Sequence, residues 1–366
     1  MRVVFAGGGT GGHLMPALAI ATALRRRAPG AEVLFVGTAR GIEVEKVPAA
    51  GWELRLVSGG PVKGVGAIRA MRNLASSLRG VAQTWRLLGR PRADVVVCVG
   101  GYASFAAGVA AWLRRIPVVV LEQNAIPGRT NRLLSRFASL AIAPFEAAIA
   151  RLHGRRREVC ANPVRPDLVE RFATLRQAKT EDAFHLFVFG GSQGARRLNE
   201  ATREFAAKNA PRIGRDLVVT HQTGRLDFDT VSAFYRERNV AVDVRAFIDD
   251  MAEAYARCDL VVCRAGATSI AELAALGLPG VLVPYPFAAD DHQRANAAAL
   301  VEAGAARAID DAALDADSLA AVIDELGRDR SRLAAMAEAA RRFGRPDAAD
   351  HVAMRVLDLG GLAHVS

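Results

Sequence analysis

The feature that most restricts the fold is a series of short, valine-rich apolar runs that alternate with segments of helical periodicity. In the first half the runs read RVVFAG, EVLFVG, DVVVCV, PVVVLEQ and SLAIA, and in the second FHLFVFG, DLVVTHQ, VDVRAF, DLVVCR and PGVLVPY. Most of them do not alternate with polar residues, which is typical of strands buried on both faces. The sequence therefore predicts an α/β fold in which each half is a parallel sheet covered by helices.

Two prolines in the segment CANPVRPD, Cys160–Asp167, indicate a hinge between the halves. A chain of 366 residues is long enough for two domains with a full core each. We predict an N-terminal domain over 1–161 and a C-terminal domain over 162–343. The segment RPDAADHVAMRVLDLG predicts a last helix within 344–366, which packs back towards the N-terminal domain.

Four cysteines without paired spacing indicate small buried residues in a reducing compartment, not a disulfide or zinc framework. The first residues enter a strand directly, with no pattern of a secretory leader. No apolar run reaches the roughly 18 residues that a membrane-spanning helix needs. We therefore expect a protein of the cytoplasm.

Charge is distributed unevenly along the chain, whose formal net charge is +10. Residues 1–160 hold 23 Lys and Arg against 8 Asp and Glu, whereas residues 161–366 hold 25 against 30. Such asymmetry indicates that the first half faces an anionic surface, either nucleic acid or a membrane. No recognised nucleic-acid motif accompanies the charge, so we expect no nucleic-acid partner.

The basic segment Pro61–Arg92 contains no acidic residue and combines cationic with apolar side chains at helical spacing. The cationic residues are Lys63, Arg69, Arg72, Arg79, Arg86, Arg90 and Arg92, and the apolar ones Val65, Ile68, Met71, Leu74, Leu78, Val81, Trp85 and Leu88. This pattern is typical of a helix lying on an anionic membrane surface. The alternative is an apolar stripe that packs on the sheet beneath a solvated basic face. We expect docking on anionic lipid, with Trp112 as a further interfacial aromatic.

A glycine-rich loop follows the first strand, and Gly7, Gly9 and Gly12 match G-x-G-x-x-G before a helical pattern. This is the dinucleotide fingerprint in its usual context. A nicotinamide enzyme needs an acidic residue about 20 residues further on, at the end of the second strand. That strand ends LFVGTARG, without an acid, so we favour a loop whose bare N–H groups meet a bulkier anion.

The second half opens in the same way with FVFGGSQGARRLNE, which offers the hydroxyl of Ser192. Further on, CRAGATSIAELAALGLP places Gly266–Ser269 at a predicted helix start, where free N–H groups favour a phosphate. Glu272 follows about one turn later, within reach of a ribose diol. The alternative for this segment is an ordinary capping box.

Taken together, the motifs GGGTGGHLMPALAIA, GGYAS, LEQNAIPGRTNR, NPVR, GGSQGAR, FIDDM, CRAGATSIAE and HQRANA occur in an order that resembles the peptidoglycan glycosyltransferases of the MurG family. The resemblance runs from the first strand to the last helix. It implies the GT-B fold, in which two Rossmann-like domains with parallel sheets face each other across a cleft. It also implies transfer of N-acetylglucosamine from UDP-N-acetylglucosamine to lipid I, an undecaprenyl-diphosphate-linked acceptor, at the cytoplasmic face of the bacterial membrane.

The resemblance also implies substrate-binding residues at matching positions, and from the residues themselves we expect neither a metal nor another cofactor. They are Thr10, Gly11, Gly12, Asn124, Arg165, Ser192, Ile248, Ala267, Thr268, Ser269, Ile270, Ala271, Glu272 and Gln293. Ile248 would lie beside the uracil, and Gln293 would address the sugar hydroxyls. A one-residue shift in the alignment makes His292 the alternative to Gln293. The sequence departs from the family pattern at Leu121, where many members have histidine.

The chemistry requires that the attacking hydroxyl lose a proton and that UDP leave with negative charge. His13, next to the first glycine loop, is the candidate base, and the alternatives are an orienting or a structural histidine. Two Asp-x-Asp triplets, Asp227–Asp229 and Asp315–Asp317, resemble magnesium ligands but lie at predicted helix starts. The rival functions are another GT-B enzyme that uses a UDP-sugar, such as a lipid glycosyltransferase or a UDP-N-acetylglucosamine 2-epimerase, and a nucleic-acid-binding protein.

Overall fold

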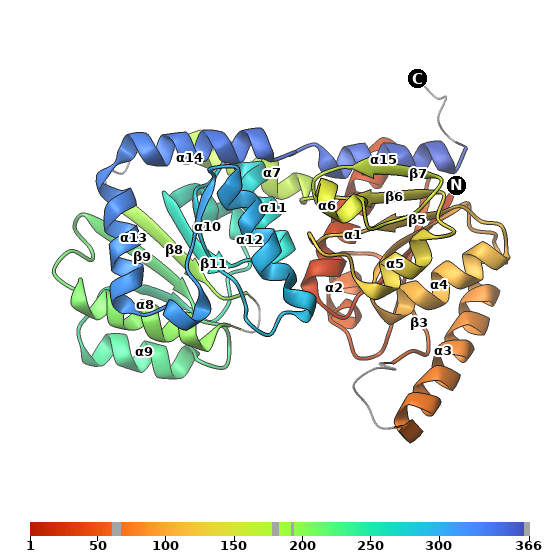
Figure 1. Cartoon of the computed structure of the whole chain (residues 1–366), viewed down its shortest axis with the longest axis horizontal. Helices are drawn as coiled ribbons and strands as arrows, with labels where there is room; N and C mark the ends of the chain where they lie inside the picture. Colours follow the sequence, from red (N-terminus) through yellow and green to blue (C-terminus); the bar gives the residue numbers. More distant parts are fainter. Residues whose placement is uncertain (61–66, 178–182, 192–193, 362–366) are drawn as a thin grey trace. The chain divides into compact units, whose positions relative to one another are not determined.

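A computed structural model of the chain describes residues 1–60, 67–177, 183–191 and 194–361, and for 67–74 the backbone alone. The chain divides into two compact units (Figure 1). Unit 1 comprises Met1–Pro166 and Asp347–Ser366, and unit 2 comprises Asp167–Pro346. Each unit is described by itself.

Unit 1 is built on a sheet which, in the described part of the chain, has seven strands in the order β3-β2-β1-β4-β5-β6-β7. All neighbouring strands pair in parallel. The strands are β1 Arg2–Gly7, β2 Glu32–Gly37, β3 Glu53–Leu56, β4 Val95–Gly100, β5 Val118–Leu121, β6 Leu140–Ala143 and β7 Arg156–Val159.

Helices cover both faces of this sheet, and successive strand residues enter opposite cores. Val3 and Phe5 of β1 pack with α1 and α15, whereas Val4 and Ala6 pack with α4 and α5. The helices are α1 Gly11–Arg27, α2 Glu43–Ala49, α3 Ala67–Leu87, α4 Gly101–Leu113, α5 Arg129–Ser135, α6 Glu146–Ile149 and α15 Ala348–Leu359. Burial on both faces explains why these strands read as continuous apolar runs.

Unit 2 repeats the architecture with a parallel sheet of six described strands in the order β10-β9-β8-β11-β12-β13. The strands are β8 Phe184–Phe189, β9 Leu217–Gln222, β10 Asp243–Arg245, β11 Leu260–Arg264, β12 Gly280–Val283 and β13 Ala306–Ala308. The helices are α7 Pro166–Gln177, α8 Arg196–Lys208, α9 Phe228–Glu237, α10 Met251–Arg257, α11 Ala267–Leu276, α12 His292–Glu302, α13 Ala316–Arg328 and α14 Arg330–Phe343. Short 3₁₀ turns occur at Ala289–Asp291 and Asp311–Ala313.

The predicted parallel sheets are confirmed, but three of their strands were not predicted. These strands, β3, β7 and β13, read ELRL, RREV and ARA, and each lies at an edge of its sheet. An edge strand pairs on one side only, and β3 and β7 are largely exposed, so neither needs an apolar run. Strand β13 has only three residues, too few to form one. Polar edge strands therefore escaped a search for apolar segments.

Helix α15 returns from unit 2 and packs against α1 within unit 1. Val352 and Val356 are fully buried in the core that α1 shares. Glu158 of β7 accepts hydrogen bonds from His351 and from Arg355, whose Nε lies 3.0 Å away. Although partial burial alone would raise the pKa of Glu158, the hydrogen bonds from His351 and Arg355 lower it overall. Apolar burial and this ionic cluster together hold the C-terminal helix on unit 1.

Candidate functional site

The sheet order of each unit places the glycine-rich segments at the carboxyl ends of adjacent strands. In unit 1, β1 lies between β2 and β4, and in unit 2, β8 lies between β9 and β11. In open parallel sheets these reversals of strand order are where ligands bind, beyond the carboxyl ends of the strands. The candidate residues of unit 1 follow β1, β5 and β7, and most of those in unit 2 follow β8, β11 and β12.

The first glycine loop leads from β1 into an uncapped helix. Gly7, Gly8 and Gly9 have φ values of 144°, 142° and 87°, which favour glycine. Thr10 is the N-cap of α1 but makes no capping hydrogen bond with its side chain, and the first turn of α1 contains no acidic residue. The positive end of the α1 dipole, at Gly11 and Gly12, is therefore not neutralised by a cap or by an acidic side chain in the first turn, and it favours an anion.

His13 lies in the first turn of α1, with its ring held by the loop. Its Nδ1 atom lies 3.3 Å from the carbonyl oxygen of Gly8 and 3.3 Å from Oγ1 of Thr10. A carbonyl oxygen only accepts hydrogen bonds, so the contact with Gly8 requires the proton on Nδ1. In the neutral ring the lone pair is then on Nε2. A Cβ added to Gly100, in the GGYAS motif, would lie 2.8 Å from this Nε2 atom.

Glu43, the first residue of α2, contacts this loop and was missed by the sequence interpretation. Its side chain is 1% exposed and accepts hydrogen bonds from the N–H groups of Gly9, at 2.8 Å, and Thr38, at 2.9 Å. The expectation that bare N–H groups of the loop await a ligand is therefore wrong for Gly9. The missed signal was an acid six residues after the end of β2, near the glycines of GTARG.

Asn124 follows β5 and is held by a second buried carboxylate. Glu122 is 2% exposed and accepts from the backbone N–H groups of Asn124, at 3.0 Å, and Gly128, at 3.0 Å, and from Nδ2 of Asn131, at 2.9 Å. Leu121, the departure from the family pattern, is fully buried in the core of unit 1. It packs rather than facing a substrate.

Of two further predicted residues, Arg165 lies at the end of the first segment of unit 1, and Ser192 cannot be placed. Arg165 is half-buried and immediately precedes α7. Ser192 lies outside the described residues. The flanking Gly191 and Gly194 have φ values of 90° and 78°, and a Cβ at Gly194 would collide with the carbonyl oxygen of Thr223. This second glycine turn thus also needs glycine at defined positions.

The segment Ala267–Glu272 forms the first part of α11. Gly266 is its N-cap, and no side chain caps the helix, so the capping-box alternative is wrong. Oγ1 of Thr268 is shielded from solvent and has no hydrogen-bond partner among the described residues. Ile270 is buried, whereas Ser269 and Ala271 are half-buried. An uncapped helix start beside an unused hydroxyl is suited to a diphosphate.

Glu272 is oriented by a tyrosine from the preceding helix. The hydroxyl of Tyr255, in α10, donates to Oε2 of Glu272 over 2.8 Å. Burial and the neighbouring Glu272 hold the pKa of Tyr255 well above its usual value, so its proton remains available as a donor. The tyrosine thus fixes one carboxylate oxygen of Glu272.

Ile248, Gln293 and His292 lie in loops or helix starts of unit 2. Ile248 is 6% exposed, and its N–H donates to Oε1 of Gln222 over 3.2 Å. Oε1 of Gln293 accepts from the N–H of Tyr285 at 2.9 Å. Nδ1 of His292 donates to the carbonyl oxygen of Ala289 over 2.7 Å. Gln293 and His292 are both half-buried at the start of α12, so geometry leaves both alternatives open.

Comparison with known proteins matches both units. Models of the glycosyltransferase family 28 N-terminal and C-terminal domains match residues 3–143 and 185–352. The chain is 46% identical over 359 residues to the UDP-N-acetylglucosamine--N-acetylmuramyl-(pentapeptide) pyrophosphoryl-undecaprenol N-acetylglucosamine transferase of Anaeromyxobacter dehalogenans (strain 2CP-C), with 98% of this chain and 93% of the relative covered. It is 30% identical to the crystal structure of MurG from Acinetobacter baumannii, with a TM-score of 0.76 and coverage of 98% and 99%.

The chain belongs to the MurG family. Its two parallel α/β sheets form the GT-B fold of MurG and of glycosyltransferase family 28. A UDP-GlcNAc 2-epimerase from Neisseria meningitidis, crystallised with UDP-GlcNAc, shares 14% identity at a TM-score of 0.68, with coverage of 98% and 100%. That likeness concerns the fold alone.

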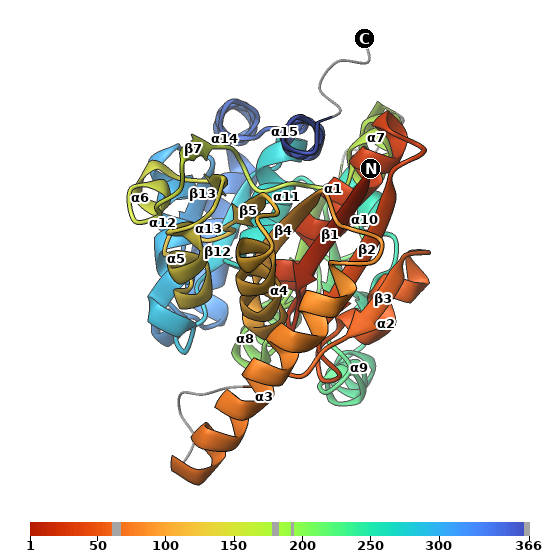
Figure 2. The same ribbon diagram turned by 90° about the vertical axis from the view of Figure 1, so that its right-hand side faces the viewer.

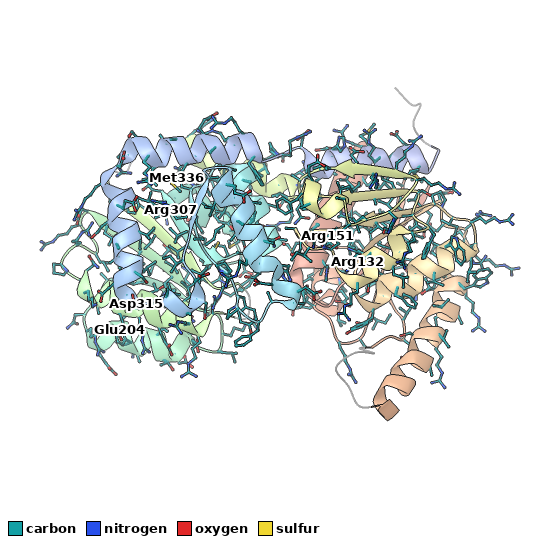
Figure 3. All side chains as sticks on the ribbon, viewed as in Figure 1. Arg132, Arg151, Glu204, Arg307, Asp315 and Met336 are labelled. Carbon is teal, nitrogen blue, oxygen red and sulfur yellow. The ribbon has the colours of Figure 1, made fainter. Side chains whose placement is uncertain are left out.

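The two acidic triplets of this MurG-family chain support helices. The Asp227 carboxylate accepts from Nδ2 of Asn199 at 2.7 Å, at the start of α9. Asp315, labelled in Figure 3, accepts from the N–H of Ser318 at 2.8 Å in a capping box, and Asp317 pairs with Lys208. Hydrogen bonds from Ser318 lower the pKa of Asp315. Among the described residues no cluster of His, Cys, Asp or Glu is suited to hold a metal ion.

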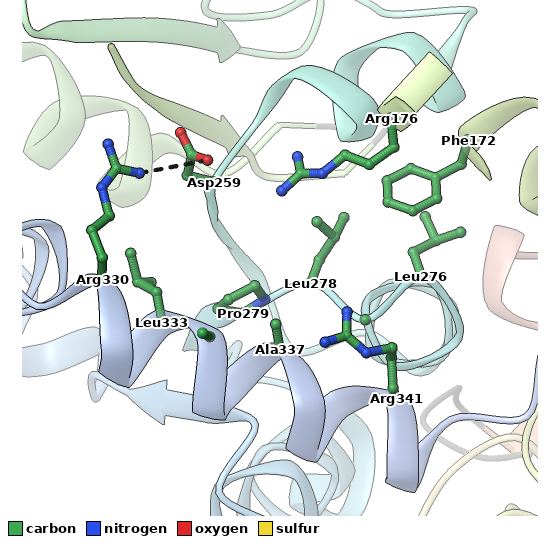
Figure 4. A pocket seen from close by; sticks show the side chains of 12 residues that line it. Phe172, Arg176, Asp259, Leu276, Leu278, Pro279, Arg330, Leu333, Ala337 and Arg341 are labelled. Carbon is green, nitrogen blue, oxygen red and sulfur yellow. Dashed lines mark ion pairs between the residues drawn. The ribbon is translucent and has the colours of Figure 1, made fainter. Parts of the chain in front are cut away.

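A cavity of about 250 Å³ lies in unit 2 beside α14, apart from the predicted residues (Figure 4). Its apolar wall includes Leu278, and its arginines are held by neighbouring groups. Nη1 of Arg176 donates to the carbonyl oxygen of Ala256 over 3.0 Å, and Arg330 pairs with Asp259 at 3.8 Å. No predicted donor-site residue is among those that line this cavity.

His221 is a structural histidine of unit 2. Its Nδ1 accepts from the hydroxyl of Tyr235 at 2.8 Å, and its Nε2–H donates to Oδ1 of Asn199 over 3.1 Å. It is fully buried, and burial lowers its pKa to about 3.

The low pKa of His221 predicts how stability depends on pH. Below about pH 6.5 the His221 ring is protonated in the unfolded chain but stays neutral in the folded chain. The free energy of unfolding therefore falls by up to about 1.4 kcal/mol per pH unit as the pH is lowered towards 3. In NMR titrations the His221 ring should stay neutral down to pH 5. Protonation of His221 near pH 6.5 in the folded protein would contradict this assignment.

Proposed function

We propose that this protein transfers N-acetylglucosamine from UDP-N-acetylglucosamine to the 4-hydroxyl of the N-acetylmuramyl unit of lipid I, inverting the linkage to β-1,4 and forming lipid II for peptidoglycan. Relatives named for this reaction are 46% identical over 98% of the chain. The observation that carries the proposal within this family is the uncapped start of α11, with Glu272 oriented one turn further along the helix.

In this proposal unit 2 binds the donor. The N–H groups at the start of α11 and the hydroxyl of Thr268 bind the diphosphate, because the helix dipole and unused donors favour an anion there. Glu272 accepts hydrogen bonds from the ribose diol, Ile248 lies beside the uracil, and Gln293 binds the sugar hydroxyls. Arg165 and Ser192 complete the charge stabilisation of departing UDP.

Unit 1 binds the acceptor and removes its proton. The uncapped start of α1, with Thr10, Gly11 and Gly12, binds diphosphate oxygens of both the donor and the acceptor, and Asn124 contributes to donor binding. The 4-hydroxyl oxygen attacks the anomeric carbon while the bond from that carbon to the UDP oxygen breaks. The hydroxyl proton passes to Nε2 of His13, whose Nδ1 proton is held by Gly8. Charge on the leaving UDP is balanced by helix ends and Arg165, with no metal in the scheme.

Replacing Glu272 by alanine tests the donor site. We expect the KM for UDP-N-acetylglucosamine to rise about 30-fold, equivalent to about 2 kcal/mol for a charged hydrogen-bond acceptor. The assay is radiolabelled UDP-N-acetylglucosamine with and without a lipid I analogue, measuring the disaccharide product. Glu302→Ala, on the exposed surface of α12, is the control. An unchanged donor KM would contradict the role of Glu272, and donor turnover to a free sugar product without acceptor would indicate a different UDP-sugar enzyme.

Replacing His13 by alanine tests the base. UDP binding, measured by calorimetry, should remain as in the wild type. At saturating acceptor, kcat should fall by about 10² to 10⁴-fold, the usual contribution of a general base. His153→Ala, exposed in the same unit, serves as control. A kcat within a few-fold of the wild type would make His13 a structural residue.

We propose further that unit 1 docks on the cytoplasmic face of the membrane as a peripheral protein. No helix in the described part of the chain is long and apolar enough to cross a bilayer. Helices α3 and α4 lie side by side (Figure 2) and expose Leu78 at 63%, Trp85 at 38% and Trp112 at 52%. Arg114 lies over the Trp85 ring, 4.2 Å from its centroid. Exposed apolar and aromatic groups among arginines are suited to an interface with anionic lipid.

The described part of the basic segment bears on both earlier alternatives. Leu88 is fully buried and Val81 is half-buried, so part of the apolar stripe packs on the core. Leu78 and Trp85 remain exposed beside Arg79 and Arg86. The positions Lys63 and Val65 lie outside the described residues, as do the side chains of Ile68, Arg69, Met71, Arg72 and Leu74.

Charge reversal tests membrane docking. The double variant Arg79→Glu, Arg86→Glu should bind phosphatidylglycerol vesicles at least about 30-fold more weakly, since each basic residue near anionic lipid contributes about 1 kcal/mol. Co-sedimentation with vesicles measures the change, and phosphatidylcholine vesicles should bind poorly in every case. The control Arg236→Glu, Arg328→Glu makes the same charge change in unit 2. Equal losses in both variants would refute a specific docking face.

A further inference from the structure

Three glycines of unit 1 enclose the carboxylate of Glu43, the first residue of α2. A Cβ added to Gly8, Gly37 or Gly41 would collide with the Glu43 side chain. These glycines come from the loop after β1, the end of β2 and the turn before α2. Their lack of side chains leaves a cradle that fits one carboxylate, and Glu43 fills it at 1% exposure.

Hydrogen bonds compensate the burial of this carboxylate. Oε1 accepts from the N–H of Thr38 at 2.9 Å and from its hydroxyl at 3.2 Å, and Oε2 accepts from the N–H of Gly9 at 2.8 Å. Burying a charge is costly unless such donors replace water. The loop is therefore arranged around an anion that belongs to the protein itself.

One peptide group links Glu43 to His13. The N–H of Gly9 and the carbonyl of Gly8 belong to the same peptide bond, and they point in opposite directions because the bond is trans. The N–H donates to Glu43, and the carbonyl oxygen accepts from Nδ1 of His13 over 3.3 Å. Gly8 and Gly9 have φ values of 142° and 87°, in a region where glycine peptides reorient readily. Glu43 holds this peptide in the orientation that His13 requires.

We propose that Glu43 is a positioning residue that acts on His13 through the Gly8–Gly9 peptide. Its negative charge polarises the peptide, which strengthens the hydrogen bond from Nδ1–H to the Gly8 oxygen. The neutral ring is thereby kept in the tautomer with the lone pair on Nε2, and Nε2 becomes a stronger base. A carboxylate in direct contact has the same effect on the histidine of a hydrolase triad. Here a peptide group transmits it.

The main test is Glu43→Gln, with Glu45→Gln on the same helix as control, because the Glu45 side chain is exposed. This test rests on the proposed transferase activity. We expect kcat to fall about 10- to 100-fold, a part of what a general base contributes, with the KM for UDP-N-acetylglucosamine unchanged. The acidic limb of the pH–rate profile should move to lower pH, because a weaker base is protonated only at lower pH. Unchanged kcat and pH profile would overturn the proposal.

A double-mutant cycle separates positioning from a general structural effect. In the His13→Ala background, Glu43→Gln should cause no further loss of kcat, because its effect passes through the imidazole. A further loss as large as in the wild-type background would mean that Glu43 only supports the fold of the loop, and would overturn the proposal.

The tautomer of His13 gives a measurement independent of activity. In ¹⁵N spectra of the full chain at neutral pH, the wild type should show Nδ1 protonated and Nε2 unprotonated. Glu43→Gln should shift the ring towards the Nε2–H tautomer, whereas Glu45→Gln should keep the wild-type pattern. An unaltered tautomer in a folded Glu43→Gln protein would refute the link. If the wild type fails to transfer the sugar, this measurement still decides whether Glu43 controls His13.

Discussion

Parallel pairing of strands buried on both faces is the constraint on which the rest of this molecule depends. Because neighbouring strands run in the same direction, their carboxyl ends meet at one edge of each sheet. That edge in unit 1 carries both Gly7–Gly12 and Gly100–Gly101, which are far apart in the chain. A Cβ on Gly101 would lie 3.0 Å from the Gly8 carbonyl oxygen, so only bare backbone permits this approach.

The two units share an electrostatic arrangement, in which a helix start without a side-chain cap lies in the same unit as buried carboxylates. Helices α1 and α11 both start without a side-chain cap or an acidic first turn, which leaves their dipoles available to an anion. Nearby, buried carboxylates orient polar groups in each unit: Glu43 and Glu122 organise backbone in unit 1, and Tyr255 orients Glu272 in unit 2. A family 28 glycosyltransferase thus combines open helix ends, which suit phosphates, with carboxylates held in fixed orientations.

Sequence patterns predicted the central strands, because continuous valine-rich runs follow directly from burial on both faces. They did not predict the exposed edge strands β3 and β7, where apolar residues are not required, or the edge strand β13, which has only three residues. The helix starts after Thr10 and Gly266 were predicted, because they depend on local chain geometry, and the binding roles of their residues stay predictions. The contact of Glu43 with the first glycine loop was missed, since nothing near that residue in the chain shows which N–H groups its carboxylate will meet.

The sequence by itself determined the two parallel sheets, the glycine turns after β1 and β8, and the open helix starts, since each depends on neighbouring residues in the chain. Only the tertiary structure decided which groups contact each other from distant positions in the sequence. Gly9 meets Glu43, Glu272 meets Tyr255, and Leu121 enters the core. The physical reason is that strand order brings these segments together, and burial then favours a hydrogen-bond partner for each polar group that loses water.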